Sequence, residues 1–97
     1  MPETRYPQNG LEQDISAILL QCDPLNIAYS DDEYNPEARN IVAGLDRTGS
    51  LQDVHDLIFE VFTDFFEPWP VAHEKKRYAA AAEKIWERWQ SFISTGR

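Results

Sequence analysis

The segment DPLNIAYSDDEYNPEA, residues 23–38, separates two stretches with helical spacing of apolar residues. The pair Asp23-Pro24 ends the first helix, because a residue before proline avoids the helical region of backbone space. At the other end of the segment, Asn35 suits the N-cap of a new helix and Pro36 suits its first position. The segment therefore predicts two helices joined by an acidic connection.

The same reasoning extends outward along the chain. Asn9 is the expected N-cap of the helix before the connection, and Ser50 is the expected N-cap of a third helix. Pro68 and Pro70 separate the third helix from the last one, because proline interrupts helices. From the spacing of apolar residues, four helices are predicted: residues 10–21, 36–45, 51–66 and 72–94.

The composition is that of one compact domain. Ninety-seven residues, of which 42% are hydrophobic and 12% aromatic, can build a single core. No segment shows the alternation of apolar and polar residues that a half-buried strand requires. The sequence therefore predicts an all-α fold, a small four-helix bundle formed by residues 9–97, with residues 1–8 as a flexible N-terminal arm.

The cysteine content and the N-terminal residues indicate a cellular location. Cys22 is the single cysteine, so no internal disulfide can form, which suits a reducing compartment. The first residues lack the basic start and apolar run of a signal peptide, and no apolar run reaches membrane-spanning length. We therefore expect a cytoplasmic protein that does not enter a membrane.

The charge is strongly negative and uneven. The net charge is −8; residues 1–37 carry eight acidic and one basic side chain, whereas residues 68–97 carry three acidic and six basic side chains. Binding to nucleic acid needs a positive footprint on the protein. The basic cluster Lys75, Lys76 and Arg77 is more simply a solvated helix face, so we expect no nucleic-acid partner.

The sequence shows no pattern of metal binding or catalysis. His55 and His73 lie far apart, and Cys22 stands alone, so none of the compact zinc-ligand spacings is present. The acids Asp31 to Glu33 lack the alternating positions and the glycine of a calcium loop. There is no glycine-flanked nucleophilic serine and no phosphate-binding glycine loop. We expect no metal, no cofactor and no enzymatic activity.

The large aromatic residues could fill the core or line a ligand pocket. A bundle of this length needs large side chains in its centre, which favours the core. Trp69, held between two prolines, is expected to be partly exposed. The aromatic residues in question are Phe62, Phe65, Phe66, Trp69, Trp86 and Trp89.

The acidic connection has two interpretations that the sequence leaves open. In the first, its carboxylates stabilise the start of the following helix by about 0.3–1 kcal/mol each, and Tyr34 packs onto the core. In the second, the acids and Tyr34 form an outward surface for a basic protein, because tyrosine is favoured at interfaces and complementary charge speeds encounter. The predicted partner-binding residues are Asp23, Asp31, Asp32, Glu33, Tyr34 and Glu37.

A family resemblance rests on residues 23–25 (DPL), 27 (Ile), 32–38 (DEYNPEA) and 41–45 (IVAGL). On these residues the chain resembles the YugE-like proteins, a family of small bacterial all-α proteins of unknown function. The resemblance implies a compact helical domain without established catalytic activity. Proteins of this layout are also similar to immunity proteins of polymorphic toxin systems, which implies that the chain neutralises a basic toxin by binding it.

Together, these observations predict a non-enzymatic, protein-binding domain of a bacterial cytoplasm. The resemblance extends this to an immunity-type protein that acts through the acidic connection. The alternative is a structural or regulatory subunit that forms homo-oligomers through its aromatic residues and its last helix.

Overall fold

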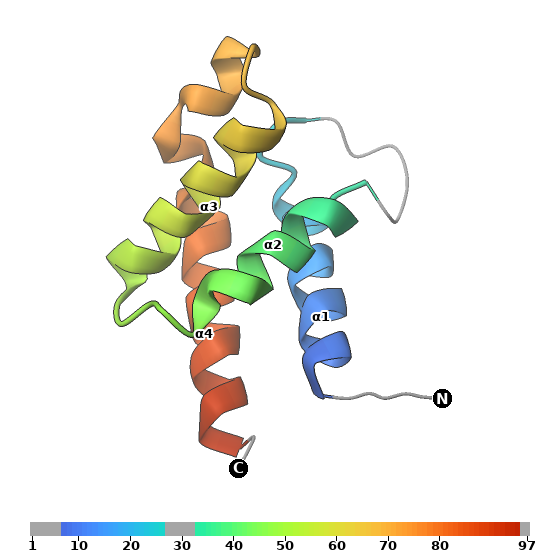
Figure 1. Cartoon of the computed structure of the whole chain (residues 1–97), viewed down its shortest axis with the longest axis vertical. Helices are drawn as coiled ribbons and strands as arrows, with labels where there is room; N and C mark the ends of the chain where they lie inside the picture. Colours follow the sequence, from blue (N-terminus) through green and yellow to red (C-terminus); the bar gives the residue numbers. More distant parts are fainter. Residues whose placement is uncertain (1–6, 27–32, 96–97) are drawn as a thin grey trace.

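The protein is a bundle of helices (Figure 1). The computed structural model describes residues 7–26 and 33–95. Two short 3₁₀ helices, η1 (Pro70–His73) and η2 (Lys75–Tyr78), precede the last α-helix. The α-helices are α1 (Pro7–Cys22), α2 (Asn35–Leu45), α3 (Leu51–Phe65) and α4 (Ala79–Thr95). No strand occurs in these ranges, and the predicted all-α, single-domain bundle is confirmed.

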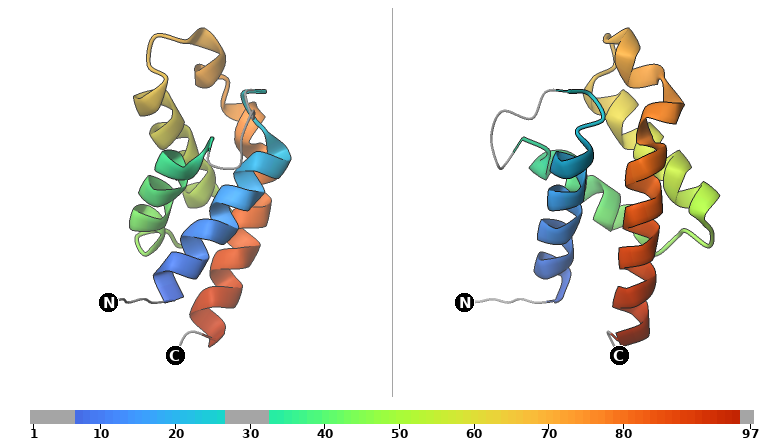
Figure 2. Two further views of the ribbon diagram at one scale, coloured as in Figure 1. Left: turned by 90° about the vertical axis from the view of Figure 1, so that its right-hand side faces the viewer. Right: turned by 180° about the vertical axis from the view of Figure 1, so that it is seen from behind.

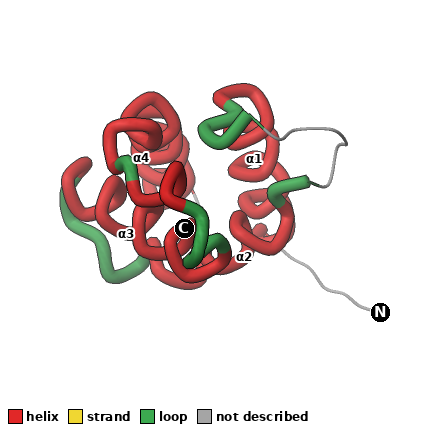
Figure 3. The backbone as a smooth tube through the Cα atoms, turned by 90° about the horizontal axis from the view of Figure 1, so that it is seen from above, coloured by secondary structure: helices red, strands yellow, loops and turns green. Residues whose placement is uncertain are grey.

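The four α-helices surround one centre. Viewed from above in Figure 3, they follow the cyclic order α1, α2, α3, α4, and each packs against its two neighbours. Figure 2 shows α1 and α4 side by side, running in opposite directions, so that α1 begins and α4 ends at the same end of the molecule. None of the helices in the described ranges combines the length and the apolar character needed to span a bilayer.

The core combines aliphatic side chains with a row of three aromatic rings. The ring of Phe62 lies between those of Tyr34 and Tyr78, at centroid distances of 5.7 and 4.9 Å. Each such pair contributes about 0.5–1.5 kcal/mol beyond the burial of its surface. The other buried apolar residues are Leu11, Ile15, Leu19, Leu25, Ala38, Ile41, Leu45, Val54, Ile58, Val61, Ala72, Ala81, Ala82 and Ile85.

The first helix is longer than predicted. It begins at Pro7, so Asn9 lies inside the helix and its predicted role as N-cap is wrong. Proline suits the first helical position, because the N–H that it lacks has no partner there. The predicted end is nearly correct: the helix stops at Cys22, and Asp23 adopts a left-handed φ of 45°.

The start of α2 differs from the prediction in the role of Asn35. Tyr34 occupies the N-cap position without a side-chain cap. The Asn35 side chain instead accepts a hydrogen bond from Ser16 Oγ of α1, with the two oxygens 2.5 Å apart. The Asn35 side chain, which the local pattern assigned to helix capping, therefore forms a tertiary contact instead.

The start of α3 is as predicted. Ser50 Oγ accepts a hydrogen bond from the backbone N–H of Asp53 at 3.1 Å. In return, the Asp53 carboxylate accepts one from the backbone N–H of Gly49 at 2.8 Å. The serine cap and the acid in the first turn thus satisfy backbone donors that the helix itself leaves without partners.

The predicted start of the last helix is wrong. The backbone from Pro70 to Tyr78 forms η1 and η2, and α4 begins only at Ala79. Two side chains take carbonyls that a continuous helix would use: the Tyr78 hydroxyl donates to Ala72 O at 2.7 Å, and His55 Nε2 lies 2.8 Å from Lys75 O. These tertiary hydrogen bonds replace the helical ones in this segment.

Gly44 marks the closest approach of α2 and α3. A Cβ atom on Gly44 would lie 2.7 Å from Cδ1 of Leu57. We expect Gly44→Val to lower the free energy of unfolding by about 2 kcal/mol, because a branched side chain forces the two helices apart. For Gly44→Ala we expect a change below about 1 kcal/mol, because the gain in helix propensity offsets a small movement of Leu57. Urea unfolding of both variants tests this, and equal stabilities would contradict it.

Tyr78 offers a second test of the fold. Burial raises the pKa of Tyr78 to about 12, so its hydroxyl remains a donor to Ala72 O at neutral pH. We expect Tyr78→Phe to lower the free energy of unfolding by about 1–2 kcal/mol, because the buried carbonyl loses its partner. The control is Thr63→Val, which removes an exposed hydrogen bond from a hydroxyl to Glu60 O. An equal effect of the two variants would contradict the role of Tyr78.

Candidate functional site

Tyr34 lies in the core and not on the surface. Its side chain is 0% exposed, and its hydroxyl donates a hydrogen bond to Asp23 Oδ1 at 2.6 Å. The prediction that Tyr34 supplies contact area to a partner is therefore wrong, because its ring packs against Phe62 inside the bundle. The alternative prediction, that Tyr34 packs onto the core, is confirmed.

Glu37 is also an interior residue. It is 4% exposed, and its Oε1 atom has no hydrogen-bond partner in the described part of the chain. Burial raises the pKa of Glu37; a hydrogen bond from its own backbone N–H opposes this rise, and the nearby Glu33 carboxylate adds to it. The prediction that Glu37 belongs to an outward surface is wrong, because α2 directs this side chain inward.

The remaining predicted residues have different positions. Asp23 and Glu33 are partly exposed. Asp31 and Asp32 lie outside the described residues, so their part in the predicted surface stays a prediction. Asp23 combines three roles at the end of α1, because it stops the helix, accepts the Tyr34 hydrogen bond and keeps part of its surface exposed.

The histidines and the cysteine have structural surroundings. His55 Nε2 lies 2.8 Å from Lys75 O, and His73 Nε2 lies 2.9 Å from Glu67 O. The thiol of Cys22 is partly buried, and burial raises its pKa. In residues 7–26 and 33–95, no group of three or more His, Cys, Asp or Glu side chains is placed to hold a metal ion.

A row of carboxylates follows the outer side of α3 and the turn after it; we call it the acidic face. Its members are spaced by three or four residues, so they share one side of the helix, and all are exposed. The helix contains no lysine or arginine. The acidic face consists of Asp53, Asp56, Glu60, Asp64 and Glu67.

The acids of this face are not equally available. Asp53 is used by the helix cap. Lys75 of η2 forms an ion pair with Asp56, and its hydrogen bond lowers the pKa of that carboxyl. The side chains of Glu60, Asp64 and Glu67 form no ion pair with any described residue. The end of the acidic face near the turn after α3 therefore carries the charge that a partner could neutralise.

Exposed aromatic residues adjoin this end; we call them the aromatic corner. Phe65 is 45% exposed and Trp69 is 37% exposed. The ring centroids of Phe66 and Trp69 are 6.0 Å apart, which fixes the tryptophan against the end of α3. The predicted partial exposure of Trp69 is confirmed, whereas the assignment of Phe65 to the core is wrong, because this residue faces away from the centre of the bundle.

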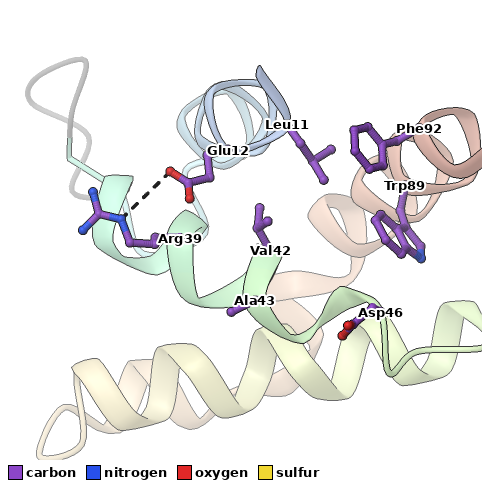
Figure 4. Close-up of a pocket in the computed structure, with 8 residues that line it drawn as sticks. All are labelled: Leu11, Glu12, Arg39, Val42, Ala43, Asp46, Trp89 and Phe92. Atoms are coloured by element: carbon purple, nitrogen blue, oxygen red, sulfur yellow. Dashed lines mark ion pairs between the residues drawn. The ribbon is translucent and has the colours of Figure 1, made fainter. Parts of the chain in front are cut away.

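A groove opens between α1, α2 and the C-terminal half of α4 (Figure 4). Its volume is about 270 Å³. Arg39 Nε lies 3.9 Å from Glu12 Oε1, and Asp46, at the C-terminal end of α2, lies away from this ion pair, below Trp89 in Figure 4. We call it the α1–α2–α4 groove; its lining residues are Leu11, Glu12, Arg39, Val42, Ala43, Asp46, Trp89 and Phe92.

Comparisons of the chain with protein-family models, with curated proteins and with solved structures give no match. The resemblance to the YugE-like proteins, and the immunity-type role that it implies, therefore stay predictions.

The buried carboxyl of Glu37 makes stability depend on pH. The folded protein retains this proton at pH values above 4.5, the ordinary pKa, where the unfolded chain has lost it. The contribution of Glu37 to the free energy of unfolding therefore falls as the pH rises through this interval. We expect Glu37→Gln to stabilise the protein by roughly 1 kcal/mol at pH 7 and to have little effect at pH 4.

Urea unfolding at both pH values measures this difference. Glu83→Gln, on the exposed surface of α4, is the control and should change little at either pH. A Glu37→Gln variant that is less stable than the parent at pH 7 would show that the carboxylate has a partner that compensates its burial.

Proposed function

We propose that this chain is a non-enzymatic protein-binding domain that docks a basic partner through the acidic face of α3. The observation that carries the proposal is the row of five exposed carboxylates, four of them on a helix without lysine or arginine and the fifth in the turn after it. In a chain of net charge −8, such a row concentrates negative potential on one side of the molecule. Complementary charge of this kind speeds encounter and orients the partner.

The aromatic corner provides apolar contact area, which the carboxylates do not. Exposed charges steer association, but contribute little to the lifetime of a complex, because water and salt screen them. Buried aromatic contacts give most of the binding energy at protein interfaces. Phe65 and Trp69 lie next to the unpaired carboxylates of Asp64 and Glu67, so one partner surface could contact both features.

The acidic connection before α2 remains a second part of the proposed surface. Its residues Asp23 and Glu33 are partly exposed, and Asp31 and Asp32 add charge in the sequence. If the immunity-type role applies, the partner is a basic toxin domain, for example a nuclease, whose nucleic-acid groove an acidic surface would cover.

Self-association is the second candidate function. Ile93, near the end of α4, is 41% exposed, and it follows the partly exposed residues Trp89 and Phe92. A homo-oligomer that covers these residues would show a solution mass that increases with concentration and a stability that depends on it. Sedimentation at low and at high protein concentration decides between the two candidates.

The proposal predicts a difference between two double variants with the same change in charge. We expect Glu60→Gln with Asp64→Asn to slow association with a partner captured from cell extract by about five- to tenfold at low salt. The matched control is Glu83→Gln with Glu87→Gln on the exposed surface of α4, and we expect less than a twofold effect. Association rates measured over a range of salt concentrations test this, and equal slowing by both pairs would refute the acidic face as the docking site.

A further inference from the structure

The α1–α2–α4 groove combines an apolar interior with one carboxylate that has no counter-charge. Leu11 and Val42 contribute aliphatic surface, and the rings of Trp89 and Phe92 stack at a centroid distance of 5.6 Å. Figure 4 shows Leu11 and Val42 between the Glu12–Arg39 ion pair and the rings of Trp89 and Phe92, with Asp46 below the two rings. The groove thus has a neutralised end and a negative end.

The negative end is reinforced by the backbone. Asp46 is the C-cap residue of α2, where the last carbonyl groups already give the helix a partial negative charge. The last turn of α2 contains no basic residue, and no ion pair of Asp46 occurs within the described residues. A cation bound here would therefore interact favourably with two negative groups, the Asp46 carboxylate and the C-terminal carbonyl groups of α2.

Arg47, the next residue in the chain, does not provide the counter-charge for Asp46. The guanidinium of Arg47 lies on the side of α2 that faces α3, since its Nη2 atom would be 3.4 Å from a Cβ on Gly44. There it lines a separate hollow with Asp53, Asp56 and Glu60. Asp46 therefore forms no ion pair within the described residues, and its exposed carboxylate is available to a cation of another molecule.

The size of the groove suits a side chain better than a metabolite. Its volume of about 270 Å³ is below the range of roughly 300–1,000 Å³ that is usual for small-molecule sites. The guanidinium carbon of Arg88 lies 5.9 Å from the ring centroid of Phe92, and Arg88 Nε lies 2.6 Å from Asp14 Oδ2, so this part of α4 is held in place. A preformed groove of this kind can receive one or two apolar side chains.

We propose that the α1–α2–α4 groove docks a short cationic amphipathic segment of a partner protein. An apolar side chain of that segment enters between Trp89 and Phe92 on one side and Val42 on the other. A lysine or arginine beside it pairs with Asp46. This site is separate from the acidic face of α3, and the inference does not depend on that face.

The net charge of the chain favours one of two possible occupants of the groove, a basic segment of another protein rather than a second copy of this chain. A second copy of this protein would bring a further net charge of −8 to a groove whose rim is itself negative, and the two copies would repel each other. A basic segment gains from the same charge. The groove therefore favours a cationic partner over self-association.

A synthetic peptide probes the site directly. It is an amphipathic helix of about 14 residues, four turns, with leucine on one face and lysine on the other. The protein is the full chain with Trp69→Phe, which removes the tryptophan of the aromatic corner, so that Trp89 can report on the groove. We expect saturable binding with a change in tryptophan fluorescence, and at least threefold weaker binding of a peptide with glutamine in place of lysine.

Matched variants locate the binding site. Asp46→Asn should weaken binding of the lysine peptide by about three- to fivefold, as expected for an exposed ion pair. Ala43→Arg, which places a long cationic side chain in the groove from an exposed helix position, should abolish it. Glu83→Gln, which removes one negative charge from the exposed surface of α4 outside both proposed sites, should alter the affinity by less than twofold. Circular dichroism confirms that each variant is folded.

Three results would overturn the inference. If Glu83→Gln weakens binding of the peptide as much as Asp46→Asn, binding reflects the net charge of the chain, which refutes the groove while leaving the proposed function intact. If the lysine peptide gives no saturable signal, the groove does not bind such segments. If sedimentation shows an oligomer that Ala43→Arg dissociates, the occupant is a second copy of the chain.

Discussion

The contact of Phe62 with Tyr34 and Tyr78 determines how the chain connects its helices. Tyr34 precedes α2, and its hydroxyl reaches back to Asp23 at the end of α1. Tyr78 precedes α4, and its hydroxyl reaches back to Ala72 in η1. One ring of α3 thus holds both tyrosines, and each tyrosine holds the segment before its own helix. The polar atoms of the tyrosines are satisfied by local partners, which allows the rings to be buried.

The parts of the fold that could be predicted are those with local causes. The proline after Asp23 and the serine before α3 act on their own neighbours in sequence, and both assignments were correct. The start of α4 could not be predicted, because the carbonyls of Ala72 and Lys75 are taken by side chains from elsewhere in the fold. Asn35 follows the same rule: a good capping residue serves a tertiary contact with Ser16 instead.

The candidate site, like the fold, could be predicted from the sequence only where its features have local causes. The spacing of the carboxylates on α3 was visible in the sequence, but seventeen acidic residues offer many such patterns, and only exposure distinguishes the relevant one. The burial of Tyr34 and Glu37 had no local cause, because an acidic neighbourhood is normally a surface. The α1–α2–α4 groove needs residues from three helices far apart in sequence, so no pattern could reveal it.

The basic residues in the last third of the chain form ion pairs with several acidic residues, and these pairs determine where unpaired negative charge remains. Lys75 pairs with Asp56, Arg77 with Glu74, and Arg88 with Asp14. Exposed pairs of this kind contribute little to stability, typically below about 1 kcal/mol. Their larger consequence is that they neutralise Asp56, Glu74 and Asp14, while Asp46, Asp64 and Glu67 form no ion pair with a described residue. The ion pairs therefore decide which carboxylates remain available for binding, and these adjoin exposed or partly exposed aromatic residues.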